Sequence, residues 1–276
     1  MLNITIIGGT GFVGKELASY FQSRGYTIRC PAREVLGTLS GDLGVVIYVA
    51  GYGVCSSLSN KIDCVDANIT KFISILKNCE FKRLVYFSST RLYMASENSN
   101  ELADLTFLTD DARRLFNLTK LVSEELCLSL DNAIVVRPSN IYGTALDSPL
   151  FLPSIARDAI KKSCVDMYVS PDYEKDYVSV DDVCMLIEQL VSKEYLENKI
   201  YNLAAGKNTS AQHIADIIQV ETNAEVVWHN VRSDDFFPIT NISNIVQEFD
   251  FKPRDVLNEL KVMMNSFKCA HEEGLF

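Results

Sequence analysis

The sequence predicts an α/β protein with a doubly wound parallel sheet and a smaller lobe toward its C-terminal end. Over about the first half of the chain, apolar runs typical of strands buried on both faces alternate with amphipathic helical patterns. A glycine-rich turn joins the first run to the first helix, and strands joined by helices form parallel sheets with right-handed crossovers. After Gly143 the alternation becomes irregular. We therefore expect a first domain over residues 1–145, completed by parts of the later chain, and a lobe formed mainly by residues 146–276.

The glycine-rich turn is the most informative stretch. Leu2–Ile7 reads as a strand and Lys15–Ser23 as a helix, with Gly8, Gly11 and Gly14 between them. Gly8 allows a sharp reversal, Gly11 lacks the Cβ that would keep a diphosphate from the backbone, and Gly14 allows close helix packing. The amides and the dipole at the helix start then face the phosphates. The glycine spacing alone also fits an ordinary strand-to-helix turn, but the flanking strand and helix favour a dinucleotide site.

Composition and charge exclude several classes of partner. The 276 residues are 47% hydrophobic and 22% charged with a net charge of −10, so we expect no nucleic acid or anionic membrane as the main partner. No apolar run reaches the roughly 20 residues that span a bilayer, and we expect no leader with a cleavage site before the first strand. The eight cysteines stand singly, without a CxxC pair or histidine cluster, so we expect reduced thiols in the cytoplasm and no metal site.

The second strand indicates the form of the dinucleotide. Gly25–Cys30 reads as this strand, whose end meets the adenosine ribose in a dinucleotide fold. An acid at that point binds the 2′-hydroxyl of NAD, whereas this chain offers Pro31, Ala32 and Arg33. Because an arginine suits the 2′-phosphate of NADP, NADP is favoured over NAD. Glu34 keeps NAD open, and Arg33 as a solvated surface residue is an equal alternative.

The next two predicted strands end in residues suited to a ligand. Val45–Val49 is a buried strand that ends in Ala50 and Gly51, whose small size leaves room for a cofactor. Leu84–Phe87 is another, and the three residues that follow it, 88–90, all carry hydroxyls. Open α/β sheets bind ligands at the carboxyl ends of their strands, so both ends are candidate site positions.

The other elements follow from periodicity and end signals. A long helix is expected over 109–130, with Asp110 and Asp111 in its first turn. The first domain also has an expected helix over 63–78 and a strand over 133–136. In the second lobe we expect helices over 152–162, 181–192, 211–218 and 255–267, and strands over 167–170, 177–180 and 200–204.

Together these motifs resemble the extended short-chain dehydrogenase/reductase superfamily, in its NAD(P)-dependent epimerase/dehydratase branch. The resemblance runs nearly from end to end, and later landmarks are Lys175–Val183, with lysine where arginine is usual, Tyr201–Asn202 and Phe251–Pro253. It implies a Rossmann-type domain, a nucleotide-sugar substrate in sugar or polysaccharide biosynthesis, and a homodimer through the helices over 63–78 and 109–130. With Arg33 from the second strand, the cofactor-binding residues are then Gly8, Thr10, Gly11, Phe12, Val13, Gly14, Ala50, Gly51, Asn68, Ser88, Lys120 and Pro138.

The resemblance also places a catalytic centre, where this sequence departs from the family. Family members carry Tyr-x-x-x-Lys on the long helix, whereas this chain has Phe116 and Lys120. A spacing of four places both side chains on one helical face, so the lysine positions the cofactor ribose and lowers the pKa of the tyrosine. The tyrosine exchanges a proton with the substrate as hydride moves, and Phe116 has no hydroxyl for this. The residues implied beside it are Ser89 at the reactive position and, for the substrate, Thr90, Arg91, Asn140 and Tyr142.

Three explanations of Phe116 stay open. It is a substitution in an otherwise ordinary enzyme, or it is natural in an enzyme whose acid/base group lies elsewhere, with Thr90, Tyr93 and Tyr142 the nearby hydroxyls. In the third explanation the chain is a dinucleotide-binding sensor or scaffold without chemistry. The residues also have structural alternatives: Ser88 and Ser89 as strand-end caps, Lys120 as a solvated charge, Phe116 as core, and Asn140 and Tyr142 as turn residues.

Overall fold

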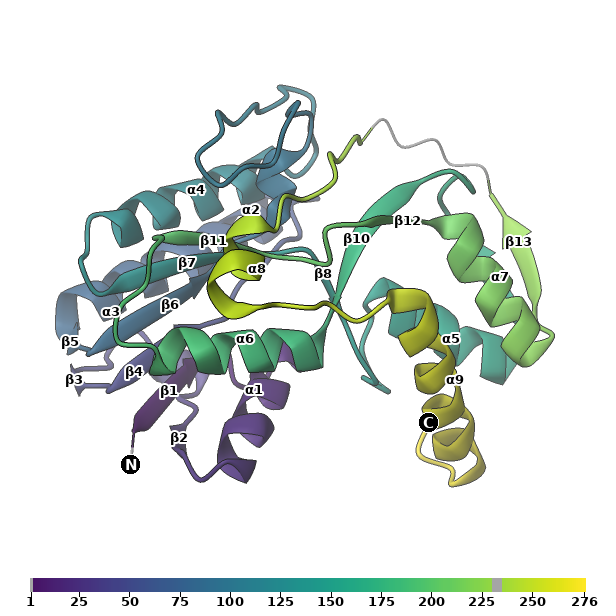
Figure 1. Cartoon of the computed structure of the whole chain (residues 1–276), viewed down its shortest axis with the longest axis horizontal. Coiled ribbons are helices and arrows are strands. Elements are labelled where there is room, and N and C mark those ends of the chain that lie inside the picture. The colour runs from purple at the N-terminus through teal and green to yellow at the C-terminus, as the bar shows by residue number, and fades with distance from the viewer. Residues whose placement is uncertain (1, 230–234) are drawn as a thin grey trace.

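A computed structural model, which describes residues 2–229 and 235–276, contains a six-stranded parallel sheet. The strand order is β11-β7-β6-β4-β1-β2, and all five neighbouring pairs are parallel. Figure 1 shows this sheet with its helices on one side of the molecule and the smaller lobe on the other. The predicted α/β fold class is confirmed. The six strands are β1 Asn3–Ile7, β2 Thr27–Arg29, β4 Val45–Tyr48, β6 Arg83–Phe87, β7 Ala133–Pro138 and β11 Ile200–Leu203.

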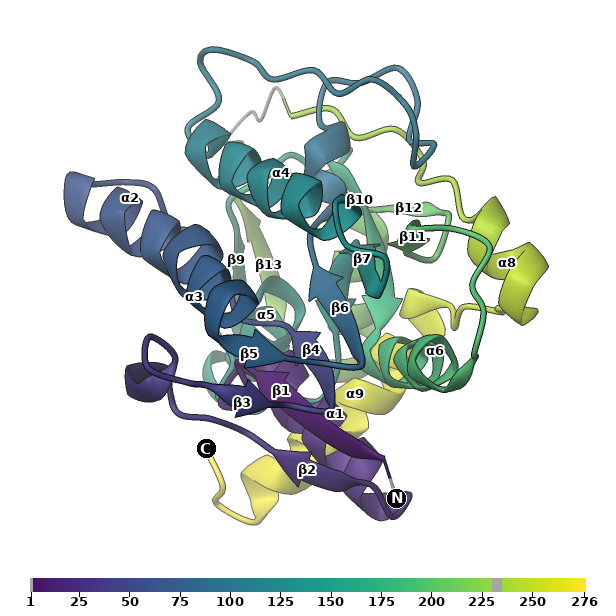
Figure 2. The same cartoon turned by 90° about the vertical axis from the view of Figure 1, so that its left-hand side faces the viewer.

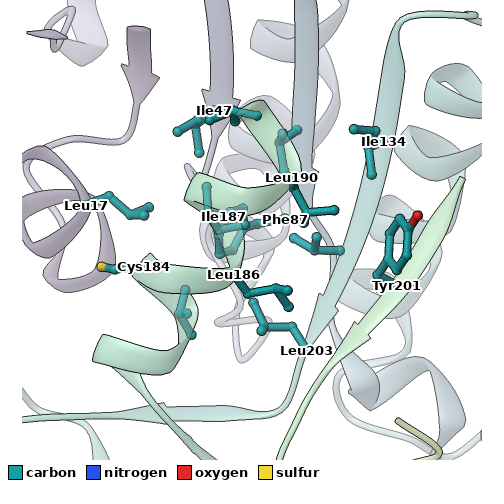
Figure 3. Packing of buried hydrophobic residues seen from close by; sticks show 14 of the residues in the cluster. Leu17, Ile47, Phe87, Ile134, Cys184, Leu186, Ile187, Leu190, Tyr201 and Leu203 are labelled. Carbon is teal, nitrogen blue, oxygen red and sulfur yellow. The ribbon is translucent and has the colours of Figure 1, made fainter. Parts of the chain in front are cut away.

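Helices cover both faces of the sheet, which explains why its central strand β4 is apolar at every position. Alternate residues of β4 divide between two cores: Val45 and Ile47 pack with α1 and α6, whereas Val46 and Tyr48 pack with α3. Figure 3 shows the first core, where α6 contributes the largest group of side chains. The covering helices are α1 Phe12–Ser23 and α6 Val180–Ser192 on one face, and α3 Lys71–Asn78 and α4 Arg114–Leu128 on the other.

The second lobe has its own core between three helices and two small sheets. Strands β8 Asn140–Tyr142, β10 Glu174–Ser179 and β12 Asn208–Ser210 form one sheet, and β9 Cys164–Met167 and β13 Glu225–Trp228 form the other. Its helices α5 Phe151–Lys162, α7 Ala211–Thr222 and α9 Val256–Glu272 pack together. The chain returns to the first sheet with α6, β11 and the short helix α8 Ser243–Phe249, which lies against β11 (Figure 1).

Several predicted element boundaries are wrong, and two of them have a clear physical reason. The long helix begins at Arg114, so Asp110 and Asp111 precede it; the Asp111 carboxylate binds the Arg91 guanidinium at 2.8 Å and the Asn117 amide at 2.8 Å. The strand expected over 167–170 is β9, which starts at Cys164 because Ser163 ends α5 in the left-handed conformation (φ 53°). The sequence reading also did not anticipate β8, β12, β13, α8 and the short pair β3 Gly41–Asp42 and β5 Cys79–Glu80.

The helix expected over 63–78 starts earlier and is interrupted. It begins with α2 Leu58–Val65, which is capped by the Ser57 hydroxyl, and continues through a π-helical turn, Asp66–Thr70, into α3. Figure 2 shows α2 and α3 as one long rod beside α4. Such π turns occur often at functional sites, and this one lies beside the first site described below.

Candidate active site

The glycine-rich turn forms one wall of a small hollow at the carboxyl end of the sheet. The hollow has a volume of about 210 Å³, and it brings together six of the predicted cofactor residues. Its other walls come from the loop after β2, from the end of β4 and from the π turn. The lining residues are Gly8, Thr10, Gly11, Pro31, Arg33, Leu36, Tyr48, Val49, Ala50, Gly51, Ala67 and Lys71.

The turn has the backbone that a diphosphate requires. Gly8 has φ +97°, and a Cβ there would lie 2.7 Å from the Ala50 amide nitrogen. A Cβ on Gly14 would collide with the Gly8 carbonyl, so the helix packs directly on the turn. Gly11 is the residue before α1, and no side chain caps that helix end. The first helix amides therefore remain available to an anion, and the residues present fit a dinucleotide diphosphate.

Lys120 lies beneath this hollow in a buried polar cluster. Its Nζ donates to the Phe87 carbonyl at 2.8 Å and lies 5.0 Å from the centre of the Tyr86 ring. A Cβ on Gly51 would approach Nζ to 3.2 Å and Asn68 Oδ1 to 3.3 Å, so only glycine leaves this space open. Lys120 is thus a buried charge rather than a solvated one.

Asn68 connects that cluster to the loop after β4. Its side-chain oxygen accepts from the Tyr52 amide at 3.2 Å, and its nitrogen donates to the Tyr52 carbonyl and to Thr119 Oγ1. Asn68 is fully buried, as is expected of a residue with so many partners. It fixes the Gly51–Tyr52 segment that covers Lys120.

Burial lowers the pKa of Lys120 to about 8 from its usual 10.5. Between pH 8 and 10.5 the unfolded chain therefore binds more protons than the folded one, so the free energy of unfolding increases as the pH rises. The Lys120→Met variant has no ionisable group at this position, so it lacks this increase in stability. We expect the free energy of unfolding of the wild type, relative to that of Lys120→Met, to increase as the pH rises from 8 to 10, measured by urea unfolding. A difference that stays constant over this range would contradict the buried charge.

Phe116 lies one helical turn before Lys120 and faces the same side. Its ring packs with Cys55, Cys64 and Tyr52, and its centre lies 5.9 Å from Lys120 Nζ. The Arg113 guanidinium lies 4.7 Å from the same ring centre and donates through Nε to the Gly53 carbonyl at 3.1 Å. The position of the missing phenol is therefore occupied by a buried ring between two cations.

A larger cavity of about 530 Å³ lies between the carboxyl ends of β6 and β7 and the second lobe. It brings together Ser89 and all four predicted substrate residues, Thr90, Arg91, Asn140 and Tyr142, and also Val13 from the turn. Ser89 Oγ accepts from the Arg91 amide at 3.1 Å, and Asn140 Nδ2 donates to the Asp176 carbonyl at 2.8 Å. Two of the three strand-end residues, Ser89 and Thr90, therefore line one cavity, as expected for a sheet of this type.

Three cations, Arg91, Arg113 and Lys175, and one buried acid, Asp176, line the cavity. Arg91 is paired with Asp111 at 2.8 Å and Asp235 at 3.5 Å, whereas Arg113 and Lys175 form no ion pair with any described residue. Lys175 Nζ lies 5.1 Å from the Tyr173 ring and 5.2 Å from the Phe237 ring. Burial, and then Arg91, lower the pKa of Lys175 to about 8, so it is charged at neutral pH. This environment suits an anionic ligand.

Two of the alternative hydroxyls differ in availability. Tyr93 donates to Asn202 at 2.7 Å and accepts from Arg137 at 2.7 Å, which makes it part of a buried network. Tyr142 lines the cavity, and its hydroxyl is buried with no hydrogen-bond partner among the described residues. Burial raises the pKa of Tyr142 well above its usual value.

Several predicted residues line neither hollow. Four of them lie behind the lining residues: Gly14, Asn68, Phe116 and Lys120. The Ser88 hydroxyl is buried without a partner among the described residues. Phe12 packs near Gly143, and Pro138 is buried at the end of β7. The sequence reading missed Arg113, although it stands three residues before Phe116 and so shares its helix face. It also missed Lys71.

Two known proteins are similar to this chain in sequence. Protein CapI of Staphylococcus aureus is 22% identical, over 78% of this chain and 72% of CapI. GDP-6-deoxy-D-talose 4-dehydrogenase of Aggregatibacter actinomycetemcomitans is 23% identical, over 79% of each chain. Both relatives are distant, but each alignment spans more than two thirds of the relative.

Solved structures share the fold over nearly the whole chain. MoeE5 in complex with UDP-glucuronic acid and NAD superposes with a TM-score of 0.80 at 16% identity, over 98% of this chain and 99% of MoeE5. RMD from Pseudomonas aeruginosa complexed with NADPH superposes with a TM-score of 0.77 at 20% identity, over 98% and 99%. The sequence pattern of one enzyme family matches residues 4–204, which include the turn, Ser89, Lys120 and the end of β11. This chain belongs to the NAD dependent epimerase/dehydratase family.

Proposed function

We propose that the protein binds NAD(P) and a nucleotide sugar, and that it acts as an epimerase, reductase or dehydratase in sugar or polysaccharide biosynthesis. The observation that carries this proposal is the cationic cavity beside the glycine turn, with Ser89 on its wall. Arg113 and Lys175, which form no ion pair with any described residue, match the diphosphate of a nucleotide sugar. We place the protein in the cytoplasm, where its eight free cysteines stay reduced.

In this proposal each part of the site has one task. The α1 amides and the turn residues bind the dinucleotide diphosphate, Lys120 positions its ribose, and Ser89 donates a hydrogen bond to the reacting sugar oxygen. The bound dinucleotide supplies hydride transfer. Thr90, Arg91, Asn140 and Tyr142 contact the substrate. The further cofactor contacts are assigned to Phe12, Val13, Gly14, Arg33, Ala50, Gly51, Asn68, Ser88 and Pro138, within a domain formed by residues 1–145 and the returning later segments.

A second candidate function is a dinucleotide-binding sensor or scaffold without turnover. Phe116 favours it, because the ring is packed between Arg113 and Lys120 and offers no proton. Calorimetric titration with NADP, NAD and a panel of UDP, GDP and dTDP sugars distinguishes the two. Binding of a sugar nucleotide supports the enzyme lineage, whereas dinucleotide binding with no sugar-nucleotide binding favours the sensor.

We also propose a homodimer through α2, α3 and α4. Ile62 on α2 is 60% exposed and Val122 on α4 is 45% exposed, and the two helices lie side by side (Figure 2). Because aspartate there would be buried uncompensated in an interface, Val122→Asp is expected to reduce the mass measured by light scattering from dimer to monomer. Val262→Asp, at a more exposed site on α9 (61%), is the control and should remain dimeric. A monomeric wild type would refute the proposal.

A further inference from the structure

The cofactor-side hollow has two basic side chains close to a single carboxylate. Lys71 Nζ lies 2.6 Å from Asp66 Oδ2, and Arg33 Nη2 lies 4.0 Å from the same oxygen. Both cations line the hollow. Lys71 is mostly buried, with 18% of its side chain exposed, whereas Arg33 is 56% exposed. The lysine is therefore held in place before any ligand binds.

The π turn explains why Lys71 points to this hollow. In a regular α-helix, residues five apart are separated by about 140° around the axis, which would direct Lys71 away from Asp66. In the π turn Asp66–Thr70 the Lys71 amide donates to the Asp66 carbonyl, five residues earlier. That bond places the two side chains one above the other. Lys71 thus reaches the same hollow that Ala67 lines.

The net charge of the side chains around the hollow is positive. One carboxylate faces two cations, and none of the described residues that line the hollow is acidic. Glu34, which follows Arg33 in the chain, does not line it. An acid that would bind a free ribose hydroxyl and repel a phosphate is therefore missing from the wall, while two donors for a phosphate are present.

We infer that Lys71 and Arg33 form a clamp for the 2′-phosphate on the adenosine ribose, which selects NADP over NAD. The inference rests on the proposed dinucleotide site and adds to it the residue that determines specificity. Asp66 positions Lys71 in the free protein, and the backbone of the π turn aligns the Asp66 and Lys71 side chains.

Fluorescence titration of the full chain with NADPH and with NADH tests this inference by binding alone. We expect the wild type to bind NADPH about tenfold or more tighter than NADH, as for one added charge-assisted contact. Lys71→Met and Arg33→Met should each weaken NADPH binding about tenfold and leave the NADH dissociation constant within about twofold. Lys77→Met, an exposed lysine of the same helix outside the hollow, is the matched control and should change neither constant.

The outcomes separate the clamp from the proposed function. Equal affinity of the wild type for both dinucleotides overturns the clamp and leaves the dinucleotide site standing. An equal loss of NADPH and NADH binding in Lys71→Met also overturns it, because that pattern shows a structural role of the lysine. Binding of neither dinucleotide by the wild type refutes the proposed function, and the clamp with it.

Discussion

Phe116→Tyr is expected to raise turnover by at least about a hundredfold, because a positioned general acid or base contributes about 10²–10⁴. The new phenol would share the position of a ring that already lies 5.9 Å from Lys120 Nζ and 4.7 Å from the Arg113 guanidinium. Both cations favour the phenolate and so lower its pKa. The measurement is kcat/KM with the sugar nucleotide that binds in calorimetry, and the wild type should show only weak turnover.

Two further variants identify the source of the gain. Phe116→Leu keeps an apolar side chain without a hydroxyl and should show no gain. Phe116→Tyr with Ser89→Ala should lose most of it, because Ser89 lies on the cavity wall as the expected partner of the reacting oxygen. If the tyrosine variant binds both ligands and gains nothing, the sensor or an acid/base group elsewhere is the better account. Loss of the residual wild-type turnover in Tyr142→Phe would then assign that role to Tyr142.

Removing one partner of the buried Arg137–Glu124 pair is expected to be the most destabilising change. Arg137 Nε donates to Glu124 Oε1 at 3.0 Å, and only 3% and 1% of the two side chains are exposed. Arg137→Met leaves the carboxylate buried without a partner, which typically costs about 3–5 kcal/mol. It also removes the donor to the Tyr93 hydroxyl. Urea unfolding should show this loss directly.

The matched control is Arg137→Met combined with Glu124→Met. Replacing a whole buried pair by apolar residues of similar size is often neutral, so the double variant should recover much of the stability. A single Arg137→Met variant within about 1 kcal/mol of the wild type would contradict the account, since breaking such a pair costs more than that. The pair joins α4 to β7, so its loss should also weaken ligand binding at the strand ends.

The sheet was predictable because its strands are buried on both faces. A strand such as β4 must be apolar at every position when helices cover both sides, and that pattern is visible in the sequence. The start of α4 was not predictable in this way. Acids in a first helical turn are a general signal, but Asp111 instead binds Arg91, twenty residues earlier, and only the tertiary structure shows that contact.

The candidate site likewise contains residues that the sequence could locate and residues that only the tertiary structure shows. Ser89 was a candidate from the sequence because it follows a strand whose carboxyl end lies at the edge of the sheet where ligands bind, whereas Asn140 was a candidate only through the family resemblance; both line the same cavity. Lys71 was not located, because a regular helix would direct it away from the hollow and no sequence signal marks the π turn. The excess charge at Lys175 likewise depends on the surrounding Tyr173 and Phe237 rings, which come from distant segments.

The most direct test of the central claim is a crystal structure of the protein with NADPH and a bound sugar nucleotide. The account predicts density for the dinucleotide diphosphate against the backbone at Gly11–Val13, with the nicotinamide beside the Phe116 ring. It predicts the sugar between Ser89 and Asn140, on the wall of the 530 Å³ cavity. Density for either ligand elsewhere, with the glycine turn bare or the ring of Phe116 turned away from the nicotinamide, would contradict it.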